Sequence, residues 1–369
     1  MDRFSRRQFL SRGSIAMAAL GAGAAFPVAG WTEEKKGMRT LGRTELQVSQ
    51  ISFGGLQIGT SALLHGAIDN GINLVHVCPV YQGGNSIRIY GEVMKDRRKE
   101  VYLALKGDPS KGIDESLKIL NTDYVDILIP EIGTVEEISN PELPGGFEKL
   151  KKEGKIRFSG FAAHKDLPEI LEKAIELGFY DVMMPSYNTG NRAVIDPLLE
   201  KAKKEQQMGF MGMKVLRGIQ KEGSKSTPEE VKEFCAELLK NPQVDTLLMG
   251  MASFEDLKTN TEACFQKYSQ AMPEGLKEKI RYAEVQECGS CGTCSKACPH
   301  GVATCDIMRL EYYLDRGEPA LAVAAYQGLS ASQRADCCQD CGKCQASCPK
   351  HLDIPARIRR THNTVATFA

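Results

Sequence analysis

The stretch GINLVHVCPVY, from Gly71 to Tyr81, has the composition of a buried β-strand. A glycine precedes its apolar residues and a proline follows them, as is typical of strands that are covered on both faces. His76 lies within the strand, and Tyr81 lies just beyond its far end. The pattern therefore indicates a core strand, and it leaves open whether the polar groups near its end serve packing or chemistry.

Seven further runs of this kind follow or precede it along the chain. The eight runs begin at Ile51, Asn73, Val101, Tyr124, Ile156, Asp181, Gly209 and Asp245. Amphipathic segments with helical spacing separate them, such as LPEILEKAIELG at 167–178 and PEEVKEFCAELLK at 228–240. Eight strand–helix units in succession predict an α/β fold, a closed parallel (β/α)8 TIM barrel over residues 38–271. An open doubly wound sheet is the alternative, but no glycine-rich phosphate turn follows the first strand.

Length, composition and net charge limit the number of structural units and the kinds of partner. A chain of 369 residues with 42% hydrophobic residues can bury a large core and is expected to hold more than one structural unit. Forty-seven basic and forty-seven acidic residues give a formal charge of zero, which disfavours a nucleic-acid partner. A small-molecule substrate and a redox protein partner are the expected ligands.

The first thirty residues differ from the rest. SRRQFL, from Ser5 to Leu10, places an arginine pair before an uncharged, Ala- and Gly-rich run from Ser14 to Gly30. This pattern predicts a twin-arginine export signal over residues 1–30 and a periplasmic or other extracytoplasmic location. A membrane anchor is the alternative, but the run is short of the roughly 20 residues that a span requires. We therefore expect membrane contact only through the signal before its cleavage.

The thirteen cysteines point to a metal centre. CGSCGTCSKACP and CQDCGKCQASCP repeat the spacing C-x2-C-x2-C-x3-C-P, which is typical of ligands to two [4Fe-4S] clusters. The eight predicted ligands are Cys288, Cys291, Cys294, Cys298, Cys338, Cys341, Cys344 and Cys348. Disulfides and structural zinc are alternatives that do not explain the duplicated spacing.

The remaining cysteines are not assigned as cluster ligands. Cys337 adjoins Cys338 without keeping the spacing, and Cys235, Cys264 and Cys305 have no evident partner. Between the two runs, the sequence predicts a pair of helices. Residues 286–369 therefore read as a small α-helical ferredoxin-type domain, joined to the barrel by a helical linker at 272–285.

Several motifs resemble those of aldo/keto reductases in content and order. They are RTLGRTELQVSQISFGG, GINLVHVCPVYQGGNSIRIYGE, LALKG, DYVDILIPE, GKIRFSGFAAH, PSYN and MGMASFEDLKTN. Together they cover essentially the whole predicted barrel. The chain is most similar to the branch of that family that carries a C-terminal ferredoxin-like domain.

The resemblance implies a catalytic set. The family reduces carbonyls with a tyrosine acid, a lysine that lowers the tyrosine pKa, an aspartate that pairs with the lysine, and a histidine that orients the carbonyl. The tyrosine and the lysine correspond to Tyr81 and Lys106, whereas the aspartate position reads His76 and the histidine position reads Glu131. His164 follows the fifth strand and is placed to line the same pocket.

Glu131 has two readings. It can pair with Lys106, or it can stay protonated in a dry pocket and donate a hydrogen bond. In some family members, a glutamate here accompanies reduction of a conjugated carbon–carbon double bond. We hypothesise that Tyr81, Lys106, Glu131 and His76 form a proton-handling site; ordinary packing is the alternative for His76 and Glu131.

The resemblance also implies NADP(H), which the residues partly contradict. The positions that usually hold the nicotinamide carboxamide read Ala162, Ala163 and Met184, and none of these side chains can form the expected hydrogen bonds. The remaining candidates for cofactor binding are Asn188, Gly250 and Asn260.

Two functions follow from these motifs, and a conventional cytoplasmic-style NADPH reductase ranks third. The first is an exported oxidoreductase that reduces a carbonyl or a conjugated double bond with electrons from the clusters. The second is an electron-transfer or partner-binding protein whose barrel has lost catalysis. Retention of Tyr81 and Lys106 favours the first.

Overall fold

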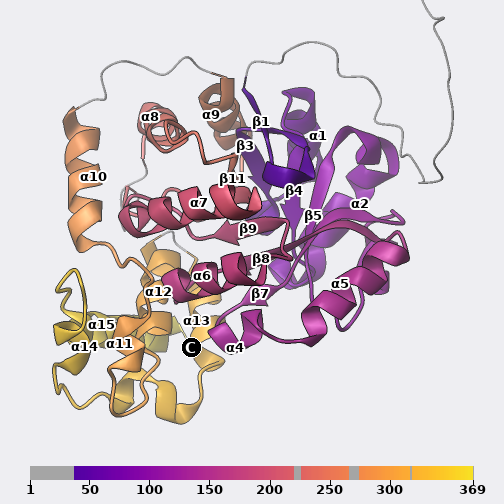
Figure 1. Cartoon of the computed structure of the whole chain (residues 1–369). Coiled ribbons are helices and arrows are strands. Elements are labelled where there is room, and N and C mark those ends of the chain that lie inside the picture. The colour runs from indigo at the N-terminus through magenta and orange to yellow at the C-terminus, as the bar shows by residue number, and fades with distance from the viewer. Residues whose placement is uncertain (1–36, 220–225, 266–273, 316–317, 369) are drawn as a thin grey trace, which may run out of the picture. The chain divides into compact units, whose positions relative to one another are not determined.

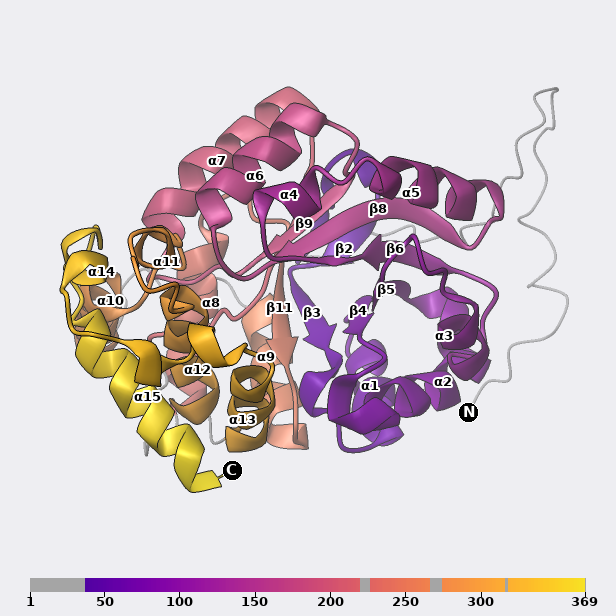
Figure 2. The same cartoon turned by 90° about the horizontal axis from the view of Figure 1, so that it is seen from below.

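A computed structural model describes residues 37–219, 226–265, 274–315 and 318–368. The predicted export signal at 1–30 lies outside these residues. The described chain contains a parallel barrel and a group of C-terminal helices (Figures 1 and 2).

The predicted barrel is confirmed. Its strands are β3 (Ile51–Gly54), β4 (Leu74–Val77), β5 (Tyr102–Lys106), β6 (Val125–Ile129), β8 (Ile156–Ala163), β9 (Val182–Pro185), β10 (Gly209–Gly212) and β11 (Thr246–Gly250). Each pairs in parallel with its neighbours, and pairing of β6 with β8 closes the ring. The two-residue strand β7 (Glu131–Ile132) follows β6 and also pairs with β8.

Helices cover the outside of the barrel. They are α1 (Ser61–Asp69), α2 (Asn85–Arg97), α3 (Asp114–Ile119), α4 (Val135–Ile138), α5 (Glu142–Lys152), α6 (Leu167–Leu177), α7 (Arg192–Gln206), α8 (Pro228–Leu239) and α9 (Phe254–Phe265). Their apolar faces pack on the outward side chains of the strands in one large core. The helical spacing of LPEILEKAIELG and PEEVKEFCAELLK thus becomes α6 and α8.

An antiparallel hairpin of β1 (Met38–Thr40) and β2 (Gln47–Ser49) precedes the barrel. Leu41, Leu46 and Val48 from this hairpin are buried with inward-facing strand residues such as Leu74 and Met211. The hairpin therefore fills the barrel interior at the amino ends of the strands, which leaves the carboxyl ends for a site.

Three acids hold neighbouring strands in register at the amino ends. The carboxylate of Asp126 accepts a hydrogen bond from the backbone N–H of Leu103 at 2.9 Å, and that of Asp181 accepts one from Ser159 at 2.9 Å. Asp245 accepts from Phe210 in the same way at 2.8 Å. Because basic side chains also bind all three acids, we assign them to stability rather than to chemistry.

The C-terminal helices form a second core. They are α10 (Glu274–Gln286), α11 (Thr293–Lys296), α12 (Thr304–Asp315), α13 (Pro319–Gln327), α14 (Lys343–Ala346) and α15 (Ile354–Phe368). The predicted pair of helices between the cysteine runs is present as α12 and α13. Glu311 on α12 is buried and binds Arg357 and Arg360 of α15. Across the described residues, no helix combines the length and apolar character that a membrane span requires.

Candidate active site

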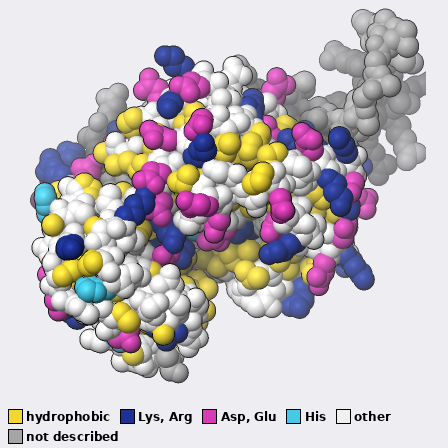
Figure 3. Space-filling model, turned by 60° about the horizontal axis from the view of Figure 1, so that its bottom comes forward, with side chains coloured by type: hydrophobic (Ala, Val, Ile, Leu, Met, Phe, Trp, Pro, Cys, Tyr) yellow, Lys and Arg dark blue, Asp and Glu magenta, His cyan; other side chains and the backbone are white. Residues whose placement is uncertain are grey.

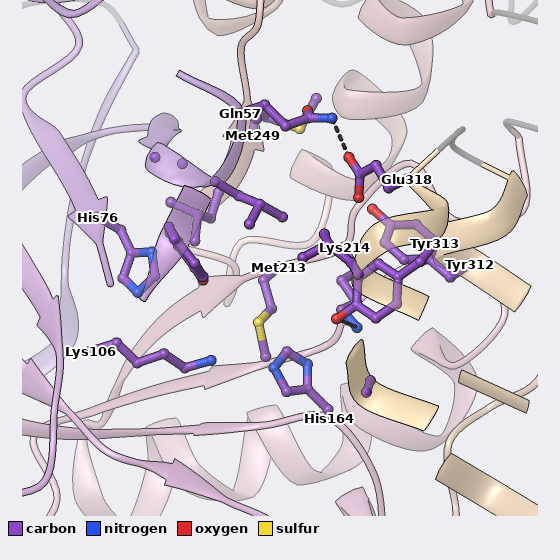
Figure 4. A pocket seen from close by; sticks show the side chains of 18 of the residues that line it. Gln57, His76, Lys106, His164, Met213, Lys214, Met249, Tyr312, Tyr313 and Glu318 are labelled. Carbon is purple, nitrogen blue, oxygen red and sulfur yellow. Dashed lines mark hydrogen bonds between the residues drawn. The ribbon is translucent and has the colours of Figure 1, made fainter. Parts of the chain in front are cut away.

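A cavity of about 400 Å³ lies at the carboxyl ends of the barrel strands. Barrel residues on its wall include His76, Tyr81, Lys106, Glu131 and His164. Residues of α12 and α13 complete the wall, so the C-terminal helices close over the barrel mouth (Figure 4). The sequence-predicted residues of the proton-handling site are therefore gathered around one space.

Lys106 and Glu131 form an ion pair in this cavity. Lys106 ends β5 with its side chain buried, and its Nζ donates to Glu131 Oε2 at 2.6 Å. Burial alone would raise the pKa of Glu131, but the charge and hydrogen bond of Lys106 outweigh it and hold that pKa below its usual range. Glu131 is therefore ionised. This supports its reading as the lysine partner and contradicts the reading as a protonated donor.

His164 extends this group. Its Nε2 lies 3.6 Å from Glu131 Oε1, and its side chain is 10% exposed. Burial, together with the positive charges of Lys214 and Lys106, holds the pKa of His164 well below its usual value. The ring is thus a neutral hydrogen-bonding group beside the carboxylate.

Tyr81 stands at the start of a tight turn after β4. The next residue, Gln82, has φ of 52°, and its side-chain amide donates to the carbonyls of Leu56 and Ile58 at 2.9 and 3.0 Å. These two bonds hold the strained turn that directs Tyr81 to the cavity.

The pKa of Tyr81 departs from expectation. Burial raises it above its usual value, and the neighbouring Cys78 thiol and Glu131 carboxylate raise it further. The prediction that Lys106 lowers this pKa is therefore wrong for the arrangement seen here, because the Lys106 ammonium is neutralised by Glu131. The phenol keeps its proton at neutral pH, so it can deliver the proton to a more basic oxygen.

His76 is a buried imidazole that faces the same space. Only 2% of the residue is exposed, its ring lies edge-on to Tyr81 with centroids 6.1 Å apart, and its Nε2 has no hydrogen-bond partner among the described residues. His164 Nδ1 is likewise unpartnered. Each unpaired buried nitrogen costs roughly 1–3 kcal/mol, which a substrate oxygen or hydroxyl can recover on binding.

The burial of His76 predicts a pH effect on stability. Burial, with a contribution from Lys106, lowers its pKa to about 3. In the unfolded chain, His76 takes up a proton near pH 6.5, whereas in the folded protein it stays neutral at that pH. Its contribution to the free energy of unfolding is therefore fully present above pH 6.5 and is lost as the pH falls toward 3. Between pH 7.5 and 5 the loss amounts to about 2 kcal/mol.

Replacing His76 with glutamine should remove this loss. Equilibrium urea unfolding at pH 7.5 and 5 is expected to show a pH dependence about 2 kcal/mol smaller in His76→Gln than in the unaltered protein. Gln47→Ala, on β2 and outside the cavity wall, removes no titratable group and is the control that should keep the original pH dependence. Equal slopes for His76→Gln and the unaltered protein would show that His76 is protonated in the folded state.

The three residues predicted to bind a cofactor do not all line this cavity. Gly250 lies on the cavity wall, whereas Asn188 and Asn260 are buried and are not among the residues that line it. Asn188 is engaged in its own turn, where its Oδ1 accepts from the Gly190 N–H at 3.0 Å. These three assignments stay predictions.

Sequence reasoning missed the wall that the C-terminal helices supply. Arg309, Tyr312 and Tyr313 on α12, with Glu318 before α13, face the cavity together with Lys214 after β10. Glu318 accepts a hydrogen bond from Gln57 on the barrel rim (Figure 4). For Lys214 alone the sequence carried a signal, because this residue lies just after β10, much as Lys106 lies at the end of β5.

The two cysteine runs share one backbone conformation. In each, the residue two places after the first cysteine has positive φ: Ser290 at 57° and Asp340 at 52°. A glycine with positive φ then precedes each short helix: Gly292 at 79° before α11 and Gly342 at 71° before α14. The duplicated spacing is thus matched by duplicated loops, which fits a pair of equivalent ligand sites.

The two runs also lie against each other. Helices α11 and α14 are in contact, and the Ser347 hydroxyl donates to the Thr293 carbonyl at 3.4 Å. None of the twelve cysteines that the structure describes is in a disulfide. Nor do three or more His, Cys, Asp or Glu side chains of the described residues converge to hold a single metal ion.

Cys305 has neighbours that the sequence did not reveal. Its thiol lies within hydrogen-bond reach of Cys288 and Cys294, both of the first run. Cys305 is also the second residue of α12, the helix whose Arg309 and Tyr313 face the cavity. One helix thus touches both the first cysteine run and the barrel-mouth cavity.

Comparisons with known proteins agree with the barrel. Residues 51–237 match the model of the aldo/keto reductase family. The chain is 29% identical over 188 residues to the uncharacterised oxidoreductase YqkF of Bacillus subtilis (strain 168), covering 44% of this chain and 60% of that protein. It is 33% identical over 151 residues to L-galactose dehydrogenase of Arabidopsis thaliana, covering 33% of this chain and 47% of that protein.

Solved structures share the fold. An aldo-keto reductase from Klebsiella pneumoniae in complex with NADPH superposes with a TM-score of 0.54 at 19% identity, over 69% of this chain and 97% of that one. The chain spans about half to three fifths of the length of the two curated relatives above.

Proposed function

The chain belongs to the aldo/keto reductase family, and on that premise we propose that it is an oxidoreductase that reduces a carbonyl group or a conjugated carbon–carbon double bond. We further propose that its electrons come through two [4Fe-4S] clusters. Export by the twin-arginine route to the periplasm is part of the same proposal, because that route carries folded proteins with their cofactors in place.

The position of α12 is the observation that carries this proposal. Its second residue, Cys305, contacts thiols of the first cysteine run, and Tyr313 near its other end lines the cavity. At 1.5 Å rise per residue, these two positions are about 12 Å apart along the helix axis. A redox group at the first run and a substrate in the cavity would thus be neighbours across one helix.

The thiols of both runs fit [4Fe-4S] clusters by number, spacing and loop conformation. In this type of domain, the first three cysteines of one run and the fourth of the other hold one cluster. That scheme assigns Cys288, Cys291, Cys294 and Cys348 to one group. When bound, such clusters supply single electrons.

Basic side chains near the first run support an anionic group there. Arg217 is buried beside Cys288, and Lys350 lies near both Cys288 and Cys348. Lys350, which follows the second run, also donates to the carbonyls of Gly190 in the barrel and Glu287 beside Cys288, at 2.6 and 2.8 Å, and so ties the end of the second run to the barrel and to the start of the first run. Positive charge at this place favours a thiolate-rich centre.

The barrel residues handle protons and orientation. Reduction of a carbonyl to an alcohol takes up two electrons and two protons. In this proposal, Tyr81 on the cavity wall donates one proton to the developing alkoxide, while solvent supplies the proton of the new C–H bond and reprotonates Tyr81. The unpaired ring nitrogens of His76 and His164 are placed to hydrogen-bond the substrate. The Lys106–Glu131 pair keeps a fixed, hydrogen-bonded ionic centre beside them.

NADP(H) fits this chain less well than the clusters do. Ala162 and Met184 are buried at the positions where the family hydrogen-bonds the carboxamide. At the adenine-side loop, the N–H groups of Ala252 and Ser253 already bind the carboxylate of Asp256. An acid at this helix start disfavours a phosphate. We therefore propose that a nicotinamide cofactor is not the main reductant.

The choice of electron donor tests this proposal. Cluster-loaded protein is incubated anaerobically with benzaldehyde or cyclohex-2-enone, and either reduced methyl viologen or NADPH is supplied. Product is expected with the viologen and not with NADPH, because the carboxamide of NADPH would meet no hydrogen-bonding side chain at Ala162, Ala163 or Met184. Faster turnover with NADPH, or no product from any aldehyde, ketone, enone or enoate with either donor, would contradict it.

A further inference from the structure

We infer that Lys214 and Arg309 form a carboxylate-binding subsite in the barrel-mouth cavity, so that the substrate is a carboxylic acid with an apolar body. The carboxylate-binding site is inferred from the cavity residues alone. The statement that the bound acid is also the substrate rests on the proposed function. The chemical class is an oxo acid or an α,β-unsaturated acid.

Lys214 presents its ammonium to the cavity from a strained backbone. It follows β10 with φ of 56°, a left-handed conformation that a lysine rarely adopts. Its Nζ donates to the Tyr313 hydroxyl at 3.2 Å and lies 4.6 and 5.2 Å from the ring centres of Tyr313 and Tyr312. Figure 4 shows the three side chains together at the cavity edge. The tyrosines thus hold the Lys214 amino group at the cavity edge.

Arg309 supplies the second cation, one helical turn before Tyr313. Its guanidinium approaches the Asp306 carboxylate only to 3.9 Å, while Lys165 already binds that acid at 2.6 Å. Its Nε is buried and has no hydrogen-bond partner among the described residues. An arginine with an unused buried donor at a cavity is suited to a carboxylate, which can accept two parallel hydrogen bonds.

The acids of the cavity are already engaged elsewhere. Glu131 binds Lys106, and Glu318 accepts from Gln57. The pKa of Lys214 is held well below its usual value by burial and by the charges of Arg309, Arg217 and Lys106, although Glu131 opposes this. A bound carboxylate would act in the opposite direction to burial and to these neighbouring cations and would favour the ammonium form of Lys214.

An apolar part of the wall defines the body of the ligand. Val215, Leu216, Leu248, Leu321 and Ala324 line the cavity. Figure 3 shows hydrophobic side chains gathered in a hollow on this side of the molecule. A molecule with one carboxylate and an aromatic or aliphatic body matches both the cationic subsite and the apolar part of the wall. Binding of its carboxylate would fix its orientation and so determine which carbon faces Tyr81.

Binding of a matched pair of probes tests this inference without turnover. trans-Cinnamate and its neutral amide, cinnamamide, have the same shape, and their affinities are measured by isothermal titration calorimetry with oxidised, cluster-loaded protein and no electron donor. Cinnamate is expected to bind at least about tenfold more tightly than cinnamamide, because charged hydrogen bonds are stronger than neutral ones.

Variants then assign the preference to the two cations. Lys214→Gln and Arg309→Gln should each weaken cinnamate binding about tenfold and change cinnamamide binding less than about twofold. Lys111→Gln is the matched control, because that side chain is 82% exposed and outside the cavity. If Lys214→Gln does not accumulate as folded protein, Arg309→Gln alone decides the test.

Equal affinity for the two probes, or unchanged cinnamate binding in Arg309→Gln, would overturn the subsite. The outcome is separable from that of the proposed function. A carboxylate preference in a protein that reduces nothing with viologen would leave the subsite standing and remove the oxidoreductase. Turnover of neutral enones without a carboxylate preference would do the reverse.

Discussion

Tyr81→Phe is expected to lower turnover of an aldehyde or enone with reduced viologen by about 10²- to 10⁴-fold, the usual contribution of a positioned general acid. The change removes one hydroxyl and keeps the ring that stands edge-on to His76. The raised pKa of the phenol keeps the proton on Tyr81 until a strongly basic oxygen develops. Steady-state rates should therefore show a fall in kcat with little change in KM, at unchanged iron content.

Tyr90→Phe is the matched control. The Tyr90 hydroxyl is fully buried and donates to the His76 carbonyl at 3.0 Å, behind the strand rather than in the cavity. Its loss should cost about 1 kcal/mol of stability and leave turnover within about tenfold. If Tyr81→Phe turns over as fast as Tyr90→Phe, Tyr81 is not the proton donor, and the reading of the barrel as a docking scaffold gains ground.

The second large effect concerns iron. Cys341→Ser is expected to reduce the iron content of anaerobically purified protein from about eight atoms per chain to about four, because one of the two clusters loses a ligand. Cys341 is exposed, so its replacement should not disturb packing. Iron is counted by colorimetric assay on protein of known concentration.

Cys337→Ser serves as the control for this change. Cys337 adjoins the second run, and its thiol donates to the Ala331 carbonyl at 3.3 Å. Because it does not keep the repeated spacing, about eight iron atoms should remain. A loss in Cys337→Ser with none in Cys341→Ser would reassign the ligand, and an unaltered protein with about four iron atoms would remove the two-cluster model.

The barrel could be predicted because its signals are local. Each strand is an apolar run, and each helix between strands has its own amphipathic spacing, so the eight units can be read one at a time. GINLVHVCPVY is such a case, since Leu74 to Val77 form β4 as its composition indicates. A closed barrel of eight strands requires the fourth and fifth strands to pair as neighbours. The pairing of β6 with β8 therefore follows from the number of strands rather than from any single residue.

The site was only partly predictable because it joins distant segments. Lys106 and Glu131 lie at the ends of consecutive strands, and their contact could be expected from strand order. The approach of α12 to the cavity could not, because nothing in Arg309 or Tyr313 indicates which surface of the barrel they meet. The raised pKa of Tyr81 also depends on burial and on the Lys106–Glu131 contact, neither of which a motif records.

An anaerobic titration tests the central claim, that electrons reach the barrel site through the clusters rather than from a nicotinamide. Cluster-loaded protein is titrated with dithionite and, separately, with NADPH, while the visible absorption of the clusters and the fluorescence of NADPH are followed. The account predicts bleaching by dithionite, no bleaching by NADPH and no saturable change in NADPH fluorescence. Bleaching by NADPH, or saturable binding of it, would contradict the account.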